Sequence, residues 1–219
     1  TGGSSVGTGS PFLTPNINTT TTYYAAAETG DGATTPISTG AGATTSTTYS
    51  NPFYSLWSNL HTQHLILGSE LTSYGMSAGK ITSLSVNLTS AGTLPMIDLS
   101  IKIGTTAATT MASFVNSSGF TPVYSSASLM PVLGNNTINF STPFNWDGSS
   151  NIVIEICHGN PSSGATMSRG MSMNTTGYVS SIKTHTGAGT AASVQCANTA
   201  TNVLTYSTRP NYSFTFQPV

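Results

Sequence analysis

The chain has 219 residues, of which only 5% are charged, against roughly 25% in an ordinary soluble domain. Its formal net charge is −1 and its five basic residues are scattered, so it lacks the basic stripe that nucleic-acid binding or an anionic membrane surface requires. No apolar run approaches the roughly 18 residues of a membrane-spanning helix, and aromatic and β-branched residues are too frequent for a disordered chain. This composition suits one large all-β domain and argues against nucleic-acid binding and membrane insertion.

The first 48 residues divide into two parts. Residues 1–29 begin with a Gly/Ser-rich lead and continue as one β-rich stretch, "PFLTPNINTTTTYYAAAE". A strand without a local partner must pair with something. It is expected to dock on the main domain, to close a preceding module or to be donated to a neighbouring molecule. Residues 30–48 are rich in Gly, Thr and Ala, show no periodicity and are predicted to be a linker.

From residue 49 to residue 219 the sequence is typical of a β-sandwich. A short apolar run in "TQHLILGSEL" leads into a predicted helical turn at 69–74, and a series of short strands follows. Apolar residues alternate with polar ones along these strands, which is the period of a strand half buried against a second sheet. The inward-facing side chains are expected to be Leu84, Val86, Leu88, Ile97, Leu99, Ile101, Ile103, Ile138, Phe140, Ile152, Ile154, Ile156, Tyr212, Phe214 and Phe216. Gly, Asn and Pro separate the strands and no long helical period is present, so we predict an antiparallel β-sandwich or jelly roll.

The two cysteines, Cys157 and Cys196, are predicted to form one disulfide in an oxidising compartment. The alternative is two separate buried thiols, and a metal pair is disfavoured because neither lies in a CxxC or CxxH spacing. The residues between them have the least strand-like pattern of the domain. The bond is therefore expected to close a loose loop.

The stretch "NWDGSSNIVIEIC" combines several chemical groups, and we interpret it as a turn followed by a strand. Asp147 and Gly148 suit a tight turn, and Asp147 with Asn151 would be the first candidates for a structural Ca²⁺. Asp147 and Glu155 are separated by a turn and part of a strand and could approach one another, but a turn role for Asp147 is favoured over a catalytic pair. The odd spacing of His61 and His64 places them on opposite faces of a strand, which disfavours a histidine metal site. No nucleophile or phosphate motif is present, so we predict no enzyme and no cofactor other than that Ca²⁺.

Aromatic residues offer the candidates for ligand binding. Tyr54, Trp57 and Tyr74 would form a glycan-binding face if their rings were exposed, because sugar rings stack on aromatic side chains. The alternative is that they plug one end of the sandwich.

The order of the motifs "HTQHLILGSELTSYGMSAGKITSLSVNL", "IDLSIKIGTT", "FTPVYSS", "INFSTPFNWDGSSNIVIEICHGN" and "RPNYSFTF" resembles a β-sandwich module of large secreted and cell-surface proteins of Bacteroidota. The stretch "PNINTTTTYYAAA" upstream resembles the end of an Ig-like module of the same proteins. The resemblance implies an extracellular or cell-surface location, reached by the type IX secretion route. It implies a structural or adhesive module, with a subunit of a stalk or filament assembled through its N-terminal strand as one form of it. The implied partners are sibling modules, identical subunits, glycans or surfaces. The alternative is a carbohydrate-binding module of a secreted enzyme.

Overall fold

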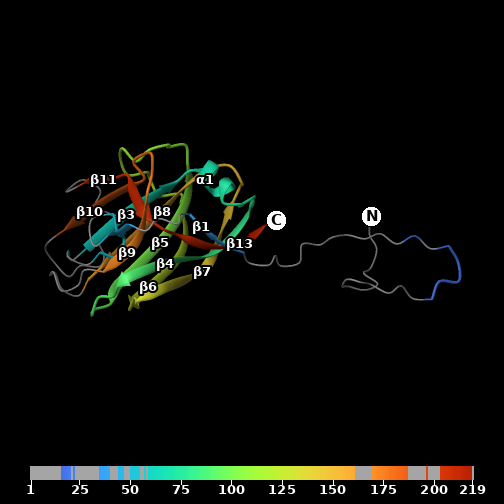
Figure 1. Ribbon diagram of the computed structural model, residues 1–219, viewed down its shortest axis with the longest axis horizontal. Helices are drawn as coiled ribbons and strands as arrows, with labels where there is room; N and C mark the ends of the chain where they lie inside the picture. The colour runs from blue at the N-terminus through green and yellow to red at the C-terminus, as the bar shows by residue number, and fades with distance from the viewer. Residues whose placement is uncertain are drawn as a thin grey trace.

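The computed structural model describes residues 16–20, 22, 35–39, 44–46, 50–54, 57, 59–160, 169–186, 196 and 203–218. Apart from one short helix, the regular elements in this part of the chain are strands (Figure 1). In chain order they are β1 (Thr35–Ser38), β2 (Thr44–Ser46), β3 (Asn59–Ile66), α1 (Gly68–Ser73), β4 (Gly79–Ser90), β5 (Met96–Thr106), β6 (Thr121–Leu129), β7 (Gly134–Trp146), β8 (Asn151–Gly159), β9 (Gly170–Thr175), β10 (Ser181–Thr186), β11 (Leu204–Tyr206), β12 (Thr208–Pro210) and β13 (Ser213–Pro218).

The strands form two antiparallel sheets that pack face to face, which confirms the predicted β-sandwich (Figure 1). One sheet, here the β4 sheet, has the order β1-β13-β4-β9-β12, with β7 paired to β4 and β2 paired to β9. The other, the β8 sheet, has the order β11-β10-β3-β8-β5-β6. β3 and β8 therefore lie in the middle of their sheet, where each has a neighbour on both sides.

The main core lies between the two sheets and contains almost all the residues expected there. Those confirmed are Leu84, Val86, Leu88, Leu99, Ile101, Ile103, Ile138, Ile152, Ile154, Ile156, Tyr212, Phe214 and Phe216, with Phe140 packed against them. Each fully buried aliphatic side chain of this kind contributes about 1.5–3 kcal/mol. Ile97 is the exception, and Met96 takes the inward place instead. The reason is that Asp98 has a φ of 48° and the pairing of β5 with β8 shifts register just after Ile97.

The predicted helical turn is α1, which connects β3 of one sheet to β4 of the other. Its first turn is closed by Glu70, whose Oε2 accepts a hydrogen bond of 2.9 Å from the Leu67 amide. Gly68 allows the helix to lie directly on the turn before β8, because a Cβ at this position would stand 2.0 Å from the Ser149 carbonyl oxygen. The side chain of Asn151 fixes the contact by accepting a hydrogen bond of 2.8 Å from the Gly68 amide.

A second, smaller core lies on the outer face of the β8 sheet. Residues 107–120 run across this face and bury it. The residues of this outer core are Leu65, Met111, Phe120, Val153 and Ile182. As a result β8 is buried on both faces, although the alternation of its sequence suggested a strand with only one apolar side.

Two segments contain strands that the sequence pattern did not indicate. β1 and β2 lie within residues 30–48, the expected linker, and pair with β13 and β9. β9 and β10 lie between the two cysteines, so that segment is not simply a loose loop. The strand expected within residues 11–28 lies largely outside the described residues.

Candidate functional site

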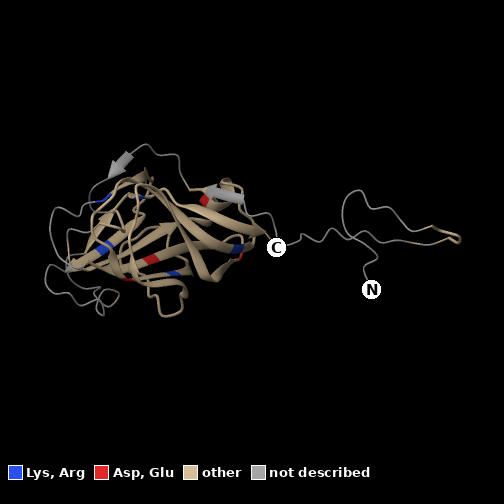
Figure 2. Cartoon of the chain, turned by 90° about the horizontal axis from the view of Figure 1, so that it is seen from below, with Lys and Arg blue, Asp and Glu red and all other residues tan. Residues whose placement is uncertain are grey.

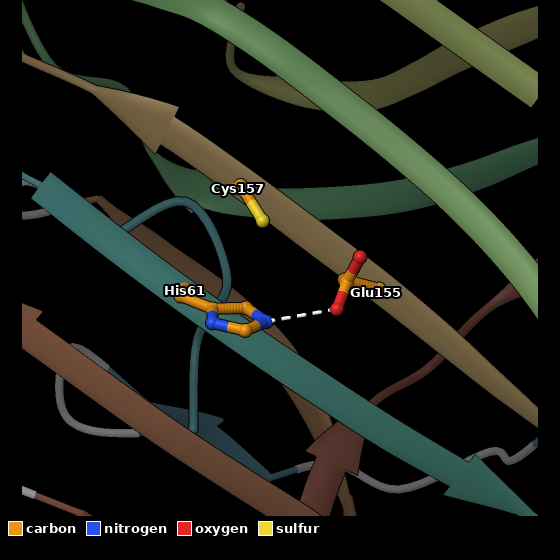
Figure 3. Close-up of side chains that lie close together, drawn as sticks. All are labelled: His61, Glu155 and Cys157. Atoms are coloured by element: carbon orange, nitrogen blue, oxygen red, sulfur yellow. Dashed lines mark hydrogen bonds and ion pairs between the residues drawn. The ribbon is translucent and has the colours of Figure 1, made fainter. Parts of the chain in front are cut away.

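A buried polar cluster lies on the outer face of the β8 sheet. In the pairing of β3 with β8, His61 is opposite Cys157 and Gln63 is opposite Glu155. Side chains two residues apart on a strand share a face, so all four project to the same side. Figure 3 shows His61 reaching from β3 towards Glu155 and Cys157 on β8. Their exposed fractions are 2% for His61 and 1% each for Glu155 and Cys157.

Glu155 is the centre of this cluster. Its Oε1 accepts hydrogen bonds of 3.0 Å from His61 Nε2 and 2.9 Å from Gln63 Nε2. Its Oε2 faces the ammonium group of Lys102 on β5 at 3.5 Å. Burial alone would raise the pKa of Glu155, but the hydrogen bonds from His61 and Gln63 outweigh it and lower the pKa to about 2. Glu155 is therefore a carboxylate at neutral pH.

The segment 107–120 closes the cluster from outside. The Gln63 side-chain amide pairs with the Val115 backbone in both directions, donating to the carbonyl over 2.8 Å and accepting from the amide over 2.7 Å. The Phe114 ring stacks on the His61 ring with their centroids 4.4 Å apart. The cluster thus fixes this segment to the sheet and is shielded from solvent by it.

The predicted disulfide is confirmed, and it determines what the cluster can do. Cys157 is bonded to Cys196, with 5.6 Å between their Cα atoms. One ring nitrogen of His61, one carboxylate oxygen of Glu155 and the sulfur of Cys157 all lie within 4.8 Å of one another, which is a metal-ligand arrangement. However, a thiolate and not a disulfide sulfur is the metal ligand. In the oxidised protein the cluster is therefore a set of buried polar contacts that hold β3, β8 and residues 107–120 together.

The two residues considered for Ca²⁺ each have protein partners. Asp147 caps the turn before β8, where its Oδ1 accepts hydrogen bonds of 2.8 and 2.7 Å from the Ser149 and Ser150 amides. The hydrogen bond from the Ser150 hydroxyl, followed by those from the two amides, lowers the pKa of Asp147 to about 2. The Asn151 side chain accepts a hydrogen bond from the Gly68 amide and donates one to the Ala108 carbonyl. Both side chains are thus occupied by hydrogen bonds to protein groups.

The aromatic candidates do not form a common face. Tyr54 is 6% exposed, and the Lys183 ammonium lies 5.2 Å from its ring centroid, so the ring is not available to stack on a sugar. Trp57 is half-buried and stacks on His185, with 4.2 Å between centroids. Tyr74 is 40% exposed but follows α1, at the opposite end of β8 from Trp57. Tyr54 therefore belongs to the interior, in line with the alternative that these rings plug one end of the sandwich.

Sequence analysis also missed an ion pair between α1 and β12, in which Arg209 is buried and the Glu70 side chain is 25% exposed. Both terminal nitrogens of Arg209 contact the Glu70 carboxylate, at 3.0 and 3.1 Å, and Nη1 also donates to the Leu65 carbonyl over 3.0 Å. The Tyr178 hydroxyl accepts from Arg209 and donates to Glu70. Burial would raise the pKa of Glu70, but the bonds from Arg209 and Tyr178 prevail and lower it.

No protein-family model matches the chain, and no curated protein matches its sequence. Among solved structures, the chain is similar to the cysteine protease and lectin-like domains of Cwp84, a surface layer associated protein of Clostridium difficile. The TM-score is 0.41 and the sequence identity 6%, and the similarity covers 74% of this chain but 33% of that one. The chain thus spans about a third of the length of that structure, and so distant a similarity carries no functional argument.

Proposed function

We propose that this chain is a non-catalytic, extracellular structural or adhesive module of a bacterial surface protein, of the kind that its sequence resembles in Bacteroidota. The observation that carries the proposal is the placement of charge. Three of the five basic side chains, Arg169, Lys183 and Arg209, have no exposed surface. Figure 2 shows how few positions in the described part of the chain are occupied by Lys, Arg, Asp or Glu.

Hydroxyl groups are frequent on the outer face of the β4 sheet, where Lys80 at the start of β4 is an exposed charge. On this face Ser85 and Thr137 share a hydrogen bond of 2.8 Å across β4 and β7, and the Ser83 hydroxyl donates to Thr215 on β13 over 2.6 Å. Such a face solvates the protein without creating an electric field, so it suits neutral polar partners such as glycans or sibling modules. The part of the chain that the structure describes contains no helix long and apolar enough to cross a bilayer.

The N-terminal part supports assembly into stalks or filaments. β1 pairs along the outer edge of β13, and Thr39 extends the contact: its amide donates to the Tyr212 carbonyl over 2.7 Å. Among the described residues β1 is the outermost strand at this end of the β4 sheet, so a further strand would pair with the outer edge of β1. If a neighbouring subunit donated the strand that pairs here, the pairing would link subunits into a filament.

Adhesion is tested by binding to a panel of neutral glycans and to itself, at low and at high salt. We expect binding that salt leaves unchanged, since few charges are available to be screened. Thr137→Lys should abolish it and Ser125→Lys, on exposed β6, should not. Binding that falls with salt, or that both substitutions affect equally, contradicts the proposal. Assembly is tested by light scattering of the chain with and without residues 1–29, and a monomer in both cases ends the filament hypothesis.

The alternative proposal, a carbohydrate-binding module of a secreted enzyme, has Tyr74 as its exposed aromatic residue. Tyr74→Ala should abolish glycan binding in that case and leave self-association intact.

A further inference from the structure

We infer that the cluster of His61, Glu155 and Cys157 becomes a binding site for a thiophilic divalent cation, Zn²⁺ by its donor chemistry, when the Cys157–Cys196 disulfide is reduced. The oxidised protein would not bind the ion. This inference is independent of the proposed adhesive role, and its experiment does not depend on any partner.

The first support is geometric. The three ligand atoms already lie within 4.8 Å of one another. Bond lengths of about 2.0–2.3 Å in a tetrahedral Zn²⁺ site place ligand atoms roughly 3.3–3.8 Å apart, so movements of about 1 Å complete the site. The ligands come from β3 and β8, the two central strands of the β8 sheet, where the paired positions of His61 and Cys157 fix their spacing. A site on paired strands needs no loop to fold around the ion.

The second support is the state of the donor atoms. His61 is buried and its Nδ1 has no hydrogen-bond partner within the described residues. Its Nε2 holds a proton against the Glu155 carboxylate, and a cation can occupy the place of that proton. One sulfur, one imidazole nitrogen and one carboxylate oxygen form a donor set that favours Zn²⁺ over the hard cations Ca²⁺ and Mg²⁺. A water molecule would complete the tetrahedron.

The chemical step can be written in full. A dithiol reductant supplies two electrons and two protons, the S–S bond breaks, and Cys157 and Cys196 become thiols while the reductant becomes a disulfide. On binding the cation, Cys157 releases its thiol proton to solvent, and the ring proton of His61 moves from Nε2 to Nδ1, so that His61 binds as a neutral imidazole. Lys102 opposes the ion by its charge, but its side chain is 29% exposed and its ammonium can move into water. Lys102→Met is therefore expected to tighten cation binding.

A pair of matched variants tests the inference. Cys196→Ser and Cys157→Ser each remove the disulfide and leave one thiol, but only the first leaves the thiol beside His61 and Glu155. With Co²⁺ as the probe, Cys196→Ser should bind one ion per chain and show a thiolate-to-cobalt charge-transfer band, which Zn²⁺ then removes by competition. Cys157→Ser and the oxidised wild type should show neither. In the Cys196→Ser background, Glu155→Gln and His61→Gln should each weaken Co²⁺ binding at least tenfold.

Circular dichroism and thermal unfolding, with and without Zn²⁺, accompany each variant. Zn²⁺ should raise the Tm of Cys196→Ser and leave that of Cys157→Ser unchanged. If Cys196→Ser folds only with Zn²⁺ present, the inference also holds. Equal binding by the two variants, binding without the thiolate band, or a Cys196→Ser chain that Zn²⁺ neither binds nor folds would each overturn it.

Discussion

Ionisation of Glu155 should make the free energy of unfolding depend on pH between about 2 and 4.5, and Glu155→Gln should remove this dependence. The unfolded chain takes up the Glu155 proton near the ordinary value of 4.5, whereas the folded protein takes it up near pH 2. Between these values the unfolded state binds more protons, so the free energy of unfolding rises with pH and is lost as the pH falls. A gap of about 2.5 pH units corresponds to about 3 kcal/mol. Glu155→Gln should therefore be less stable than the wild type by about 3 kcal/mol at pH 7.

The assay is urea unfolding, followed by tryptophan fluorescence, at several pH values from 7 to 2.5. The difference between wild type and Glu155→Gln should be constant above pH 5 and shrink towards zero near pH 2. Asp147, whose pKa is also about 2, contributes to both curves and cancels in their difference. A difference that stays the same at all pH values would show that the variant loses packing and not a stabilised carboxylate.

The remaining predictions concern the Glu70–Arg209 ion pair, the packing of residues 107–120 on the β8 sheet, and the disulfide. Glu70→Ala should lower the free energy of unfolding by about 3 kcal/mol, because it leaves the Arg209 guanidinium buried without its counter-ion, and Glu70→Ala with Arg209→Met should recover part of the loss. Gly104→Ala should lower the free energy of unfolding by about 1–3 kcal/mol, because its Cβ would stand 2.0 Å from the Phe120 ring. Proteolysis within residues 107–120 should also become faster, and an unchanged rate of proteolysis would contradict this packing. Reduction of the disulfide, which joins residues 39 apart, should lower the free energy of unfolding by about 4 kcal/mol. Equal urea midpoints for the oxidised and reduced proteins would show that the disulfide does not stabilise the fold.

The strands of the main core were predictable because their side chains alternate. Ile152, Ile154 and Ile156 are buried between the sheets on β8 as the period of two required. The helical turn was predictable from its local sequence, and the disulfide from the presence of two cysteines outside any metal-binding spacing. β10 was not, because its sequence, "SIKTHT", buries Lys183 and His185 and so has no apolar period to find.

Short strands were missed for a different reason. β1 and β2 consist of four and three residues, and what makes them strands is the open edge of β13 and of β9, which are more than 100 residues away in sequence. Local propensity does not contain this information. The same limit hid the cluster at Glu155, whose hydrogen-bond partner His61 is 94 residues away. One local signal was present: a lone carboxylate in the apolar strand "NIVIEIC" cannot be buried without partners.

Two buried guanidinium groups donate hydrogen bonds to backbone carbonyls and so fix irregular segments of the chain to the sheets. Arg169 donates from Nη1 to the Phe53 carbonyl over 3.1 Å and from Nη2 to the Leu94 carbonyl, and Arg209 reaches the Leu65 carbonyl. These carbonyls lie at or beyond strand ends, where the sheet offers no amide partner, and a guanidinium with five donors can satisfy several of them at once. Because the groups are buried, salt screens them little. The guanidinium groups of Arg169 and Arg209 therefore act on the protein's own backbone, where they hold irregular segments next to the sheets.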